Sequence, residues 1–184
     1  IPVQNYGTTV MGIAKSQIDK QRTNVAMATG DHTPGTCVTT LLRWHFPKTR
    51  YNADPAVTLI VQQFDMWMRL WDHFADNQQQ MTRLWQMSLA KMKPAKNRWA
   101  YATGPVSATV ASLLELGINP IHPIMWWVPP KLRDAKARES DEMYQLLPKH
   151  DIHAHHRIRY EVARIAENKV WRTASVQDSG GGLD

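Results

Sequence analysis

A run of cations with interleaved aromatic rings is the part of this sequence best suited to chemistry. Residues 77–114 contain five Lys or Arg residues and no Asp or Glu, while the whole chain has a formal net charge of +6. Lysine and arginine neutralise phosphates, and aromatic faces stack on bases. The alternative is a solvated helix end and loop beside ordinary core aromatics. The predicted nucleic-acid-binding residues are Arg83, Lys91, Lys93, Lys96, Arg98, Trp99 and Tyr101.

The tripeptide at residues 103–105, Thr-Gly-Pro, follows this stretch and opens a predicted helix. Free N–H groups at a helix start could hold a phosphate delivered by Lys96 or Arg98. The simpler interpretation is an ordinary helix start.

A histidine cluster, HDIHAHH at residues 150–156, contains the densest group of potential metal ligands. His153 and His156 could share one helical face and bind zinc, but no second ligand pair accompanies them. A surface cluster whose charge rises below about pH 6.5 is the simpler interpretation. We therefore expect no metal and no cofactor.

No catalytic centre can be assigned from sequence signatures. Cys37 is the single cysteine, which excludes an internal disulfide, and without an obvious activating base we predict a buried structural thiol. Asp72 and His73 are neighbours on a predicted helix and do not face one another. Walker-type loops, nucleophile elbows and dinucleotide-binding loops do not occur. We expect a protein that binds and is not itself an enzyme.

Helices must position these residues. Asp54 as an N-cap and Pro55 at the first helical position begin the strongest one, along which apolar residues recur at three- and four-residue spacing. The next helix ends at Pro94, and we expect the two to form an antiparallel hairpin. Further helices are predicted near residues 16–29, 36–46, 105–116 and 152–173. The predicted class is all-α, an irregular bundle of about five to six helices without substantial sheet.

A strap rich in proline and tryptophan should follow residue 117. Four prolines within residues 118–130 exclude a helix and a central strand. The strap either covers the domain or docks a partner through Met125, Trp126 and Trp127. The expected organisation is a helical core at 1–117, with a basic elbow at 83–101, and a strap, charged linker and C-terminal helix at 118–184. No run of 18 apolar residues predicts a transmembrane segment.

Four segments follow one another in order: YGTTVMGIAKSQIDKQRTNVAMATG, PGTCVTTLLRW, NADPAVTLIVQQFDMWMRLWD and GPVSATVASLLELGINPIHPIMW. Together they resemble the region after the polymerase palm in reverse transcriptases of protist non-LTR retroelements, particularly those of dinoflagellates. The resemblance covers roughly residues 1–130. It implies a helical thumb and connection region that grips an RNA or RNA/DNA duplex through its backbone. It does not imply polymerase chemistry for this chain, because no YxDD-like motif occurs; the parent polypeptide could be an RNA-directed DNA polymerase.

Three hypotheses follow. The first is a non-catalytic helical module that binds nucleic-acid backbone. The alternative is a structural or accessory subunit of a large assembly, such as an organellar ribosome or a membrane-associated complex, held to other subunits by Trp/Pro-rich contacts and an ordered glycine tail at 179–182. The least expected is a hydrolase or metalloenzyme using residues 150–156. A start at Ile1 suggests a piece of a longer polypeptide, and the lone cysteine fits an intracellular, reducing compartment.

Overall fold

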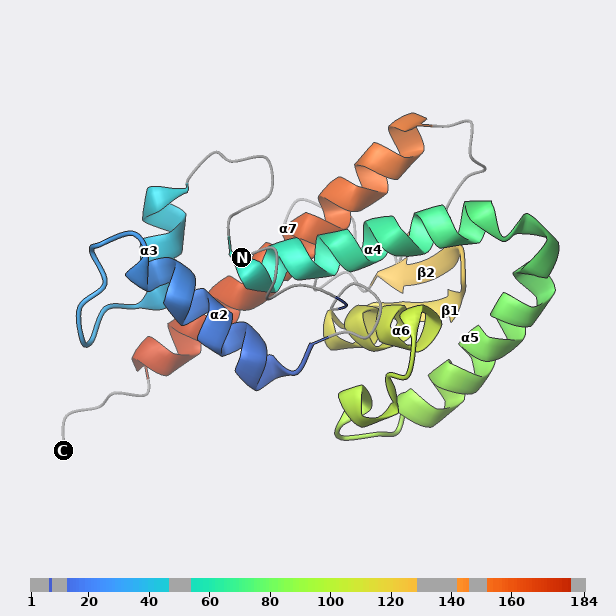
Figure 1. The fold of residues 1–184 in the computed structure, drawn as a ribbon, viewed down its shortest axis with the longest axis horizontal. Coiled ribbons are helices and arrows are strands. Elements are labelled where there is room, and N and C mark those ends of the chain that lie inside the picture. The colour runs from blue at the N-terminus through green and yellow to red at the C-terminus, as the bar shows by residue number, and fades with distance from the viewer. Residues whose placement is uncertain (1–6, 8–12, 47–53, 129–141, 146–151, 180–184) are drawn as a thin grey trace.

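The computed structural model describes residues 7, 13–46, 54–128, 142–145 and 152–179 (Figure 1). Side chains are not described at 128, 142–145, 152–158, 161 and 174–179. The described residues are mostly helical, which confirms the predicted all-α class. Their α-helices are α2 (Lys15–Met27), α3 (Val38–His45), α4 (Pro55–His73), α5 (Gln78–Met92), α6 (Pro105–Glu115) and α7 (Ile152–Ser179). Short 3₁₀ helices are η1 (Ala75–Asn77) and η2 (Arg98–Tyr101).

The start of α4 forms as its sequence predicts. The Asp54 carboxylate accepts a hydrogen bond of 2.9 Å from the Ala56 N–H, and Pro55 occupies the first turn, where its missing N–H costs nothing. The apolar stripe of α4 faces the core, as predicted. Its buried members include Val57, Val61, Phe64, Trp67 and Met68.

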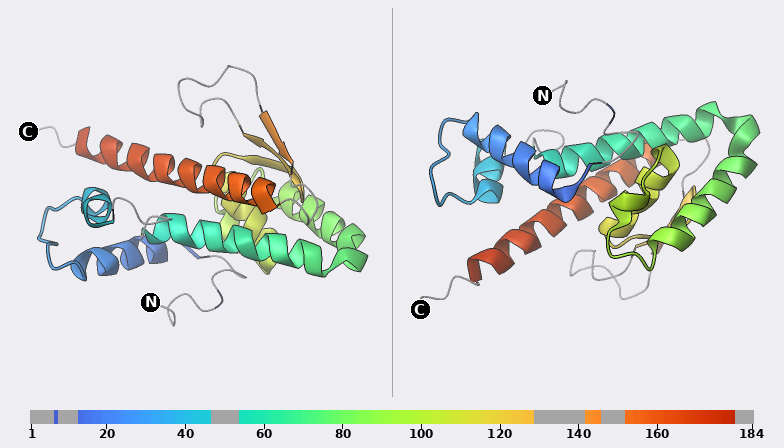
Figure 2. Two further views of the ribbon diagram at one scale, coloured as in Figure 1. Left: turned by 90° about the horizontal axis from the view of Figure 1, so that it is seen from above. Right: turned by 60° about the horizontal axis from the view of Figure 1, so that its bottom comes forward.

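Helix α6 is the centre of the molecule. Every residue from 107 to 113 is buried, and small side chains such as Ser107, Ala108 and Ala111 let neighbouring helices approach it closely. The predicted antiparallel hairpin of α4 and α5 is wrong. The two helices diverge from η1, and α6 lies between them (Figures 1 and 2).

Helix α7 closes the core along α4. Val162, Ala163, Ile165 and Ala166 join the same buried cluster as residues of α4, α5 and α6. This cluster therefore contains residues from both sides of the expected boundary at 117/118. No helix among the described residues is both long and apolar enough to span a membrane.

The predicted Pro/Trp strap is a small antiparallel sheet. Strands β1 (Asn119–His122) and β2 (Met125–Val128) form a hairpin, and β3 (Glu142–Gln145) pairs with the other edge of β2. The extended conformation was predicted correctly, but the exclusion of a central strand was wrong. Pro120 lies on the edge strand β1 and Pro123 in the turn, where no ladder donor is needed, and β2 itself contains no proline.

Indole groups hold this hairpin against the helices. Trp67 Nε1 donates to the Pro123 carbonyl at 3.0 Å, and Trp85 Nε1 donates to the Pro120 carbonyl at 2.8 Å. Trp126 is 1% exposed and packs edge-on against Phe64, with ring centroids 4.9 Å apart. Much of the tryptophan surplus thus serves the core of this protein.

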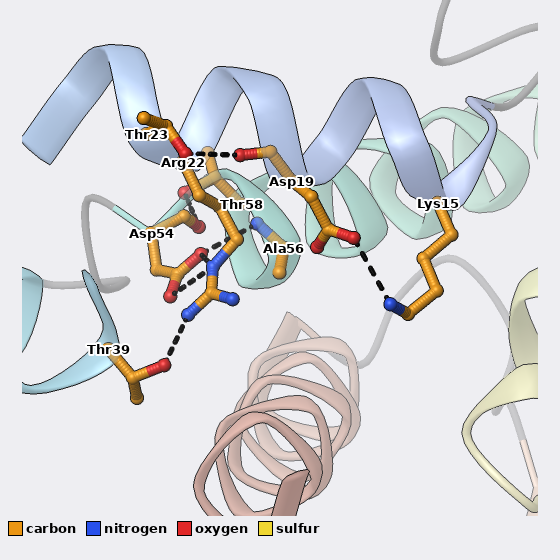
Figure 3. Close-up of polar contacts among 8 residues, drawn as sticks. All are labelled: Lys15, Asp19, Arg22, Thr23, Thr39, Asp54, Ala56 and Thr58. Carbon is orange, nitrogen blue, oxygen red and sulfur yellow. Dashed lines mark hydrogen bonds and ion pairs between the residues drawn. The ribbon is translucent and has the colours of Figure 1, made fainter. Parts of the chain in front are cut away.

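Helices α2 and α3 form a smaller body beside the C-terminal half of α7, away from α5 (Figure 2). Their own buried cluster consists of Ala26, Leu41 and Leu42. A polar tie joins them to α4: Arg22 Nε lies 2.9 Å from Asp54 Oδ1, and Arg22 Nη2 donates to Thr39 Oγ1 at 2.7 Å (Figure 3).

Candidate nucleic-acid interface

Four predicted phosphate-binding cations lie exposed on α5 and the turn after it. Arg83 and Lys91 project from α5, and Lys93 and Lys96 follow its C-terminal end. Within the part of the chain that the structure describes, none of the four forms an ion pair. No carboxylate of the described residues neutralises these four charges.

Arg98 differs from these four because it has an internal partner. Its Nη1 donates to Glu115 Oε1 at 2.9 Å, and its side chain is 26% exposed. Lys169 Nζ lies 3.7 Å from Glu115 Oε2 and donates to the Glu115 carbonyl. Burial lowers the pKa of Lys169, although Glu115 opposes this shift. The expectation that Arg98 contacts phosphate freely is thus not supported: Glu115 lies one residue beyond the acid-free stretch, which is why the sequence concealed this pair.

The predicted aromatic residues divide between core and surface. Trp99 is partly buried and packs against the main core, so its ring is not a free stacking platform. Tyr101 is 49% exposed and can offer a ring face to solvent. Of these two rings, Tyr101 is the better placed to stack on a base.

Apolar side chains interrupt the cations on α5. Leu84 is 51% exposed and Met87 is 56% exposed, between Arg83 and Lys91 in sequence. The spacing of apolar residues along α5 predicts that Met81, Leu84 and Trp85 share a buried stripe; the structure buries Met81 and Trp85 and leaves Leu84 on the surface. The exposed face of α5 therefore combines positive charge with apolar contact area.

Two N–H donors at the start of α6 already have an acceptor within the chain. Ser107 Oγ accepts hydrogen bonds from the Thr103 N–H at 2.9 Å and the Gly104 N–H at 3.1 Å. Those two donors are consequently occupied, and Pro105 has no N–H to offer. This geometry favours the simpler interpretation over a phosphate site.

The predicted docking strip is largely internal. Trp126 lies in the core, while Met125 and Trp127 are partly buried on β2. The structure therefore offers no exposed surface at Trp126 for a partner, and the docking prediction is left with Met125 and Trp127.

The histidines and aspartates considered as metal ligands or acid–base pairs do not form a site among the described residues. His150 and the glycines at 180–182 lie outside the described residues, and the side chains of His153, His155 and His156 are also not described. Elsewhere in the described chain, no group of three potential metal ligands occurs. Asp31 lies beside His45, whose Nε2 is 2.7 Å from Asp31 Oδ2.

Comparison of the chain with protein-family models, curated proteins and solved structures gave no match.

Proposed function

We propose that this chain is a non-catalytic helical module that binds nucleic-acid backbone through the basic elbow at residues 83–101. RNA or an RNA/DNA duplex is the expected partner. We also propose that the chain corresponds to the post-palm region of a reverse transcriptase, which its sequence resembles and in which a helical thumb binds a duplex.

The observation that carries the proposal is a set of four exposed cations without described carboxylate partners. Arg83 and Lys91 are eight residues apart on α5, which corresponds to about 12 Å along a helix. Lys93 and Lys96 extend the positive surface beyond its end. Such a row suits phosphates spaced along a backbone, and Tyr101 adds an exposed ring face.

A salt titration of binding tests the proposal. Four phosphate contacts predict a slope of log affinity on log salt of about −3 to −4 with duplex RNA or an RNA/DNA hybrid. Binding that is indifferent to salt would contradict a backbone interface. Measurements on both duplexes and on single strands would show which nucleic acid is preferred.

A matched pair of variants separates a local site from net charge. Lys91→Gln with Lys93→Gln removes two charges from the basic elbow and should flatten the slope by about 2. Lys20→Gln with Arg69→Gln removes the same charge from exposed positions on α2 and α4 and should leave the slope unchanged. An equal loss of affinity in both would mean that the binding depends on overall charge alone.

A second candidate function, a structural subunit of a large assembly, is favoured by exposed apolar side chains. Trp44 on α3 is 80% exposed, and Met27 and Tyr160 are 60% and 63% exposed. Isolated aromatic rings of this kind are typical anchors of protein interfaces. Trp44→Gln should then release the chain from a copurifying complex while leaving its salt-dependent nucleic-acid binding intact; retention in the complex would count against this function.

A further inference from the structure

Two exposed apolar side chains lie among the cations of α5. Leu84 is 51% exposed and Met87 is 56% exposed, and because they are three residues apart on the helix they are neighbours on its surface. Arg83 precedes Met87 by four residues and Lys91 follows it by four, so each of these cations lies about one turn from the methionine. The outer face of α5 therefore presents an apolar patch, Leu84 and Met87, with a positive charge toward each end.

An open hollow adjoins this patch near the C-terminal end of α5. Its lining residues are Gln86, Leu89, Ala90, Lys93 and Pro94. Ala90 lies three residues after Met87, so the hollow and the patch are neighbours on the surface of the helix. Lys93 places a further positive charge at the hollow, whose other lining side chains are uncharged. The patch and the hollow together provide apolar contact area within reach of several cations.

The apolar patch is poorly matched to a nucleic-acid duplex. A duplex stacks its bases inside and presents phosphates and sugar hydroxyls, to which a leucine or methionine side chain can donate no hydrogen bond. Covering such groups with apolar side chains removes water from them without replacing its hydrogen bonds. An unpaired strand instead can turn the faces of its bases toward the protein, and a methionine sulfur makes favourable contacts with aromatic rings.

We propose that α5 binds an unpaired stretch of nucleic acid, with base faces on the apolar patch and the hollow and with phosphates at Arg83, Lys91 and Lys93. This inference rests on the proposed function, because it uses the same cations, and it adds that the bound strand is single at α5. The cations supply affinity that does not depend on base pairing. The apolar patch distinguishes a strand that exposes its bases from one that does not.

Two probes of equal charge test for base contacts. One is an oligothymidylate of about 12 nucleotides, a length within the range of single-strand sites, and the other is an abasic tetrahydrofuran chain with the same number of phosphates. Fluorescence anisotropy with the full chain should show the oligothymidylate binding about fivefold more tightly, an effect of the size that one sulfur–ring contact produces. Both probes should show the same dependence on salt, because their phosphates are the same.

A matched pair of variants assigns the preference to the apolar patch. Leu84→Gln with Met87→Gln keeps good helix formers at two exposed positions, so the fold should persist, as checked by circular dichroism. This double variant should bind the two probes equally, while its affinity for a blunt RNA/DNA duplex should match that of the parent chain. Met27→Gln changes a residue that is 60% exposed on α2 and should keep the fivefold preference.

The outcomes separate this inference from the proposed function. Equal binding of the two probes by the parent chain, with a steep dependence on salt, would overturn the inference and leave the proposed function standing. A preference that survives in Leu84→Gln with Met87→Gln, or an equal loss of duplex affinity in that variant, would also overturn the inference. Absence of salt-dependent binding to every nucleic acid tested would overturn both.

Discussion

The Asp54 side chain makes two stabilising contacts in this fold. Its carboxylate caps α4 and also receives the Arg22 guanidinium from α2 (Figure 3). The residue is 3% exposed, so its charge is removed from water and depends on both contacts. The Asp-Pro pair in the sequence predicts that Asp54 caps a helix. The ion pair with Arg22 could not be predicted in this way, because Arg22 lies 32 residues earlier in the chain.

Asp54→Ala should lower the free energy of unfolding by about 3 kcal/mol, because it leaves a largely buried guanidinium without its counter-charge and removes the cap. Asp54→Asn keeps an acceptor for the Ala56 N–H and should cost less. Urea denaturation measures both. Lys15→Ala breaks the exposed pair with Asp19 and should cost less than about 0.5 kcal/mol; a comparable cost at both sites would contradict this account.

The free energy of unfolding should depend on pH through His122. Burial lowers the pKa of His122 below its ordinary value of 6.5, and its Nδ1 accepts a hydrogen bond of 3.4 Å from the Ile124 N–H. The folded state therefore binds the proton less readily than the unfolded chain. The contribution of His122 to stability is complete above pH 6.5 and is lost as the pH falls below it.

His122→Asn should accordingly flatten the decline in unfolding free energy between about pH 7 and pH 5. The measurement is denaturation of both proteins at several pH values. His73→Asn, at an exposed position at the end of α4, serves as the control and should retain the decline seen in the parent chain. Identical pH profiles for the parent chain and His122→Asn would contradict the prediction.

At the scale of elements, a helix could be predicted where its capping residue and its apolar spacing are both present in the local sequence. The start of α4 and its apolar stripe depend on neighbours within a few positions, and both were predicted correctly. The hairpin was not predicted from the four prolines of residues 118–130, because a proline removes only its own N–H from a ladder and β2 contains none. In β2 the tryptophans lie between prolines and are free to pair on both edges.

The hairpin should depend strongly on the indole donors of the helices. Trp85→Phe leaves the buried Pro120 carbonyl without its donor and should cost about 2 kcal/mol in urea denaturation. Gln86→Leu removes the neighbouring bond from Nε2 to the Ile121 carbonyl at an exposed position and should cost much less. Equal costs would mean that the indole N–H adds nothing to the packing of its ring.

The candidate interface was predictable only in part, because several of its contacts join residues that are far apart in the sequence. Counting charges within 83–101 identifies four cations that are indeed exposed. It cannot reveal that Arg98 pairs with Glu115, that Trp99 packs against the core, or that Gln63 of α4 accepts a hydrogen bond from Ser112 of α6. Each of these contacts joins separate helices, so local periodicity carries no information about it.

At the scale of the whole molecule, the two hydrophobic clusters differ in size. The free energy of local unfolding should therefore differ between the elements that they hold together. The main cluster spans α4, α5, α6, α7 and the hairpin, whereas the cluster of α2 and α3 has three buried apolar residues. Hydrogen exchange should therefore require less free energy in α2 and α3 than in α6.

Arg43→Ala tests this separation. The Arg43 guanidinium lies 4.6 Å from the centre of the Trp171 ring and links α3 to α7. Its loss should speed amide exchange in α3 and leave α6 unchanged, as read by mass spectrometry. Faster exchange throughout α6 would show that the two bodies open together.

The packing of α7 along α4 also bears on biosynthesis. A ribosome makes α4 nearly a hundred residues before it makes Val162, and the apolar face of α4 that α7 finally covers must wait for it. At about 5–20 residues per second, that interval lasts several seconds. The nascent polypeptide would thus expose this apolar surface during translation, where a holdase chaperone could bind it.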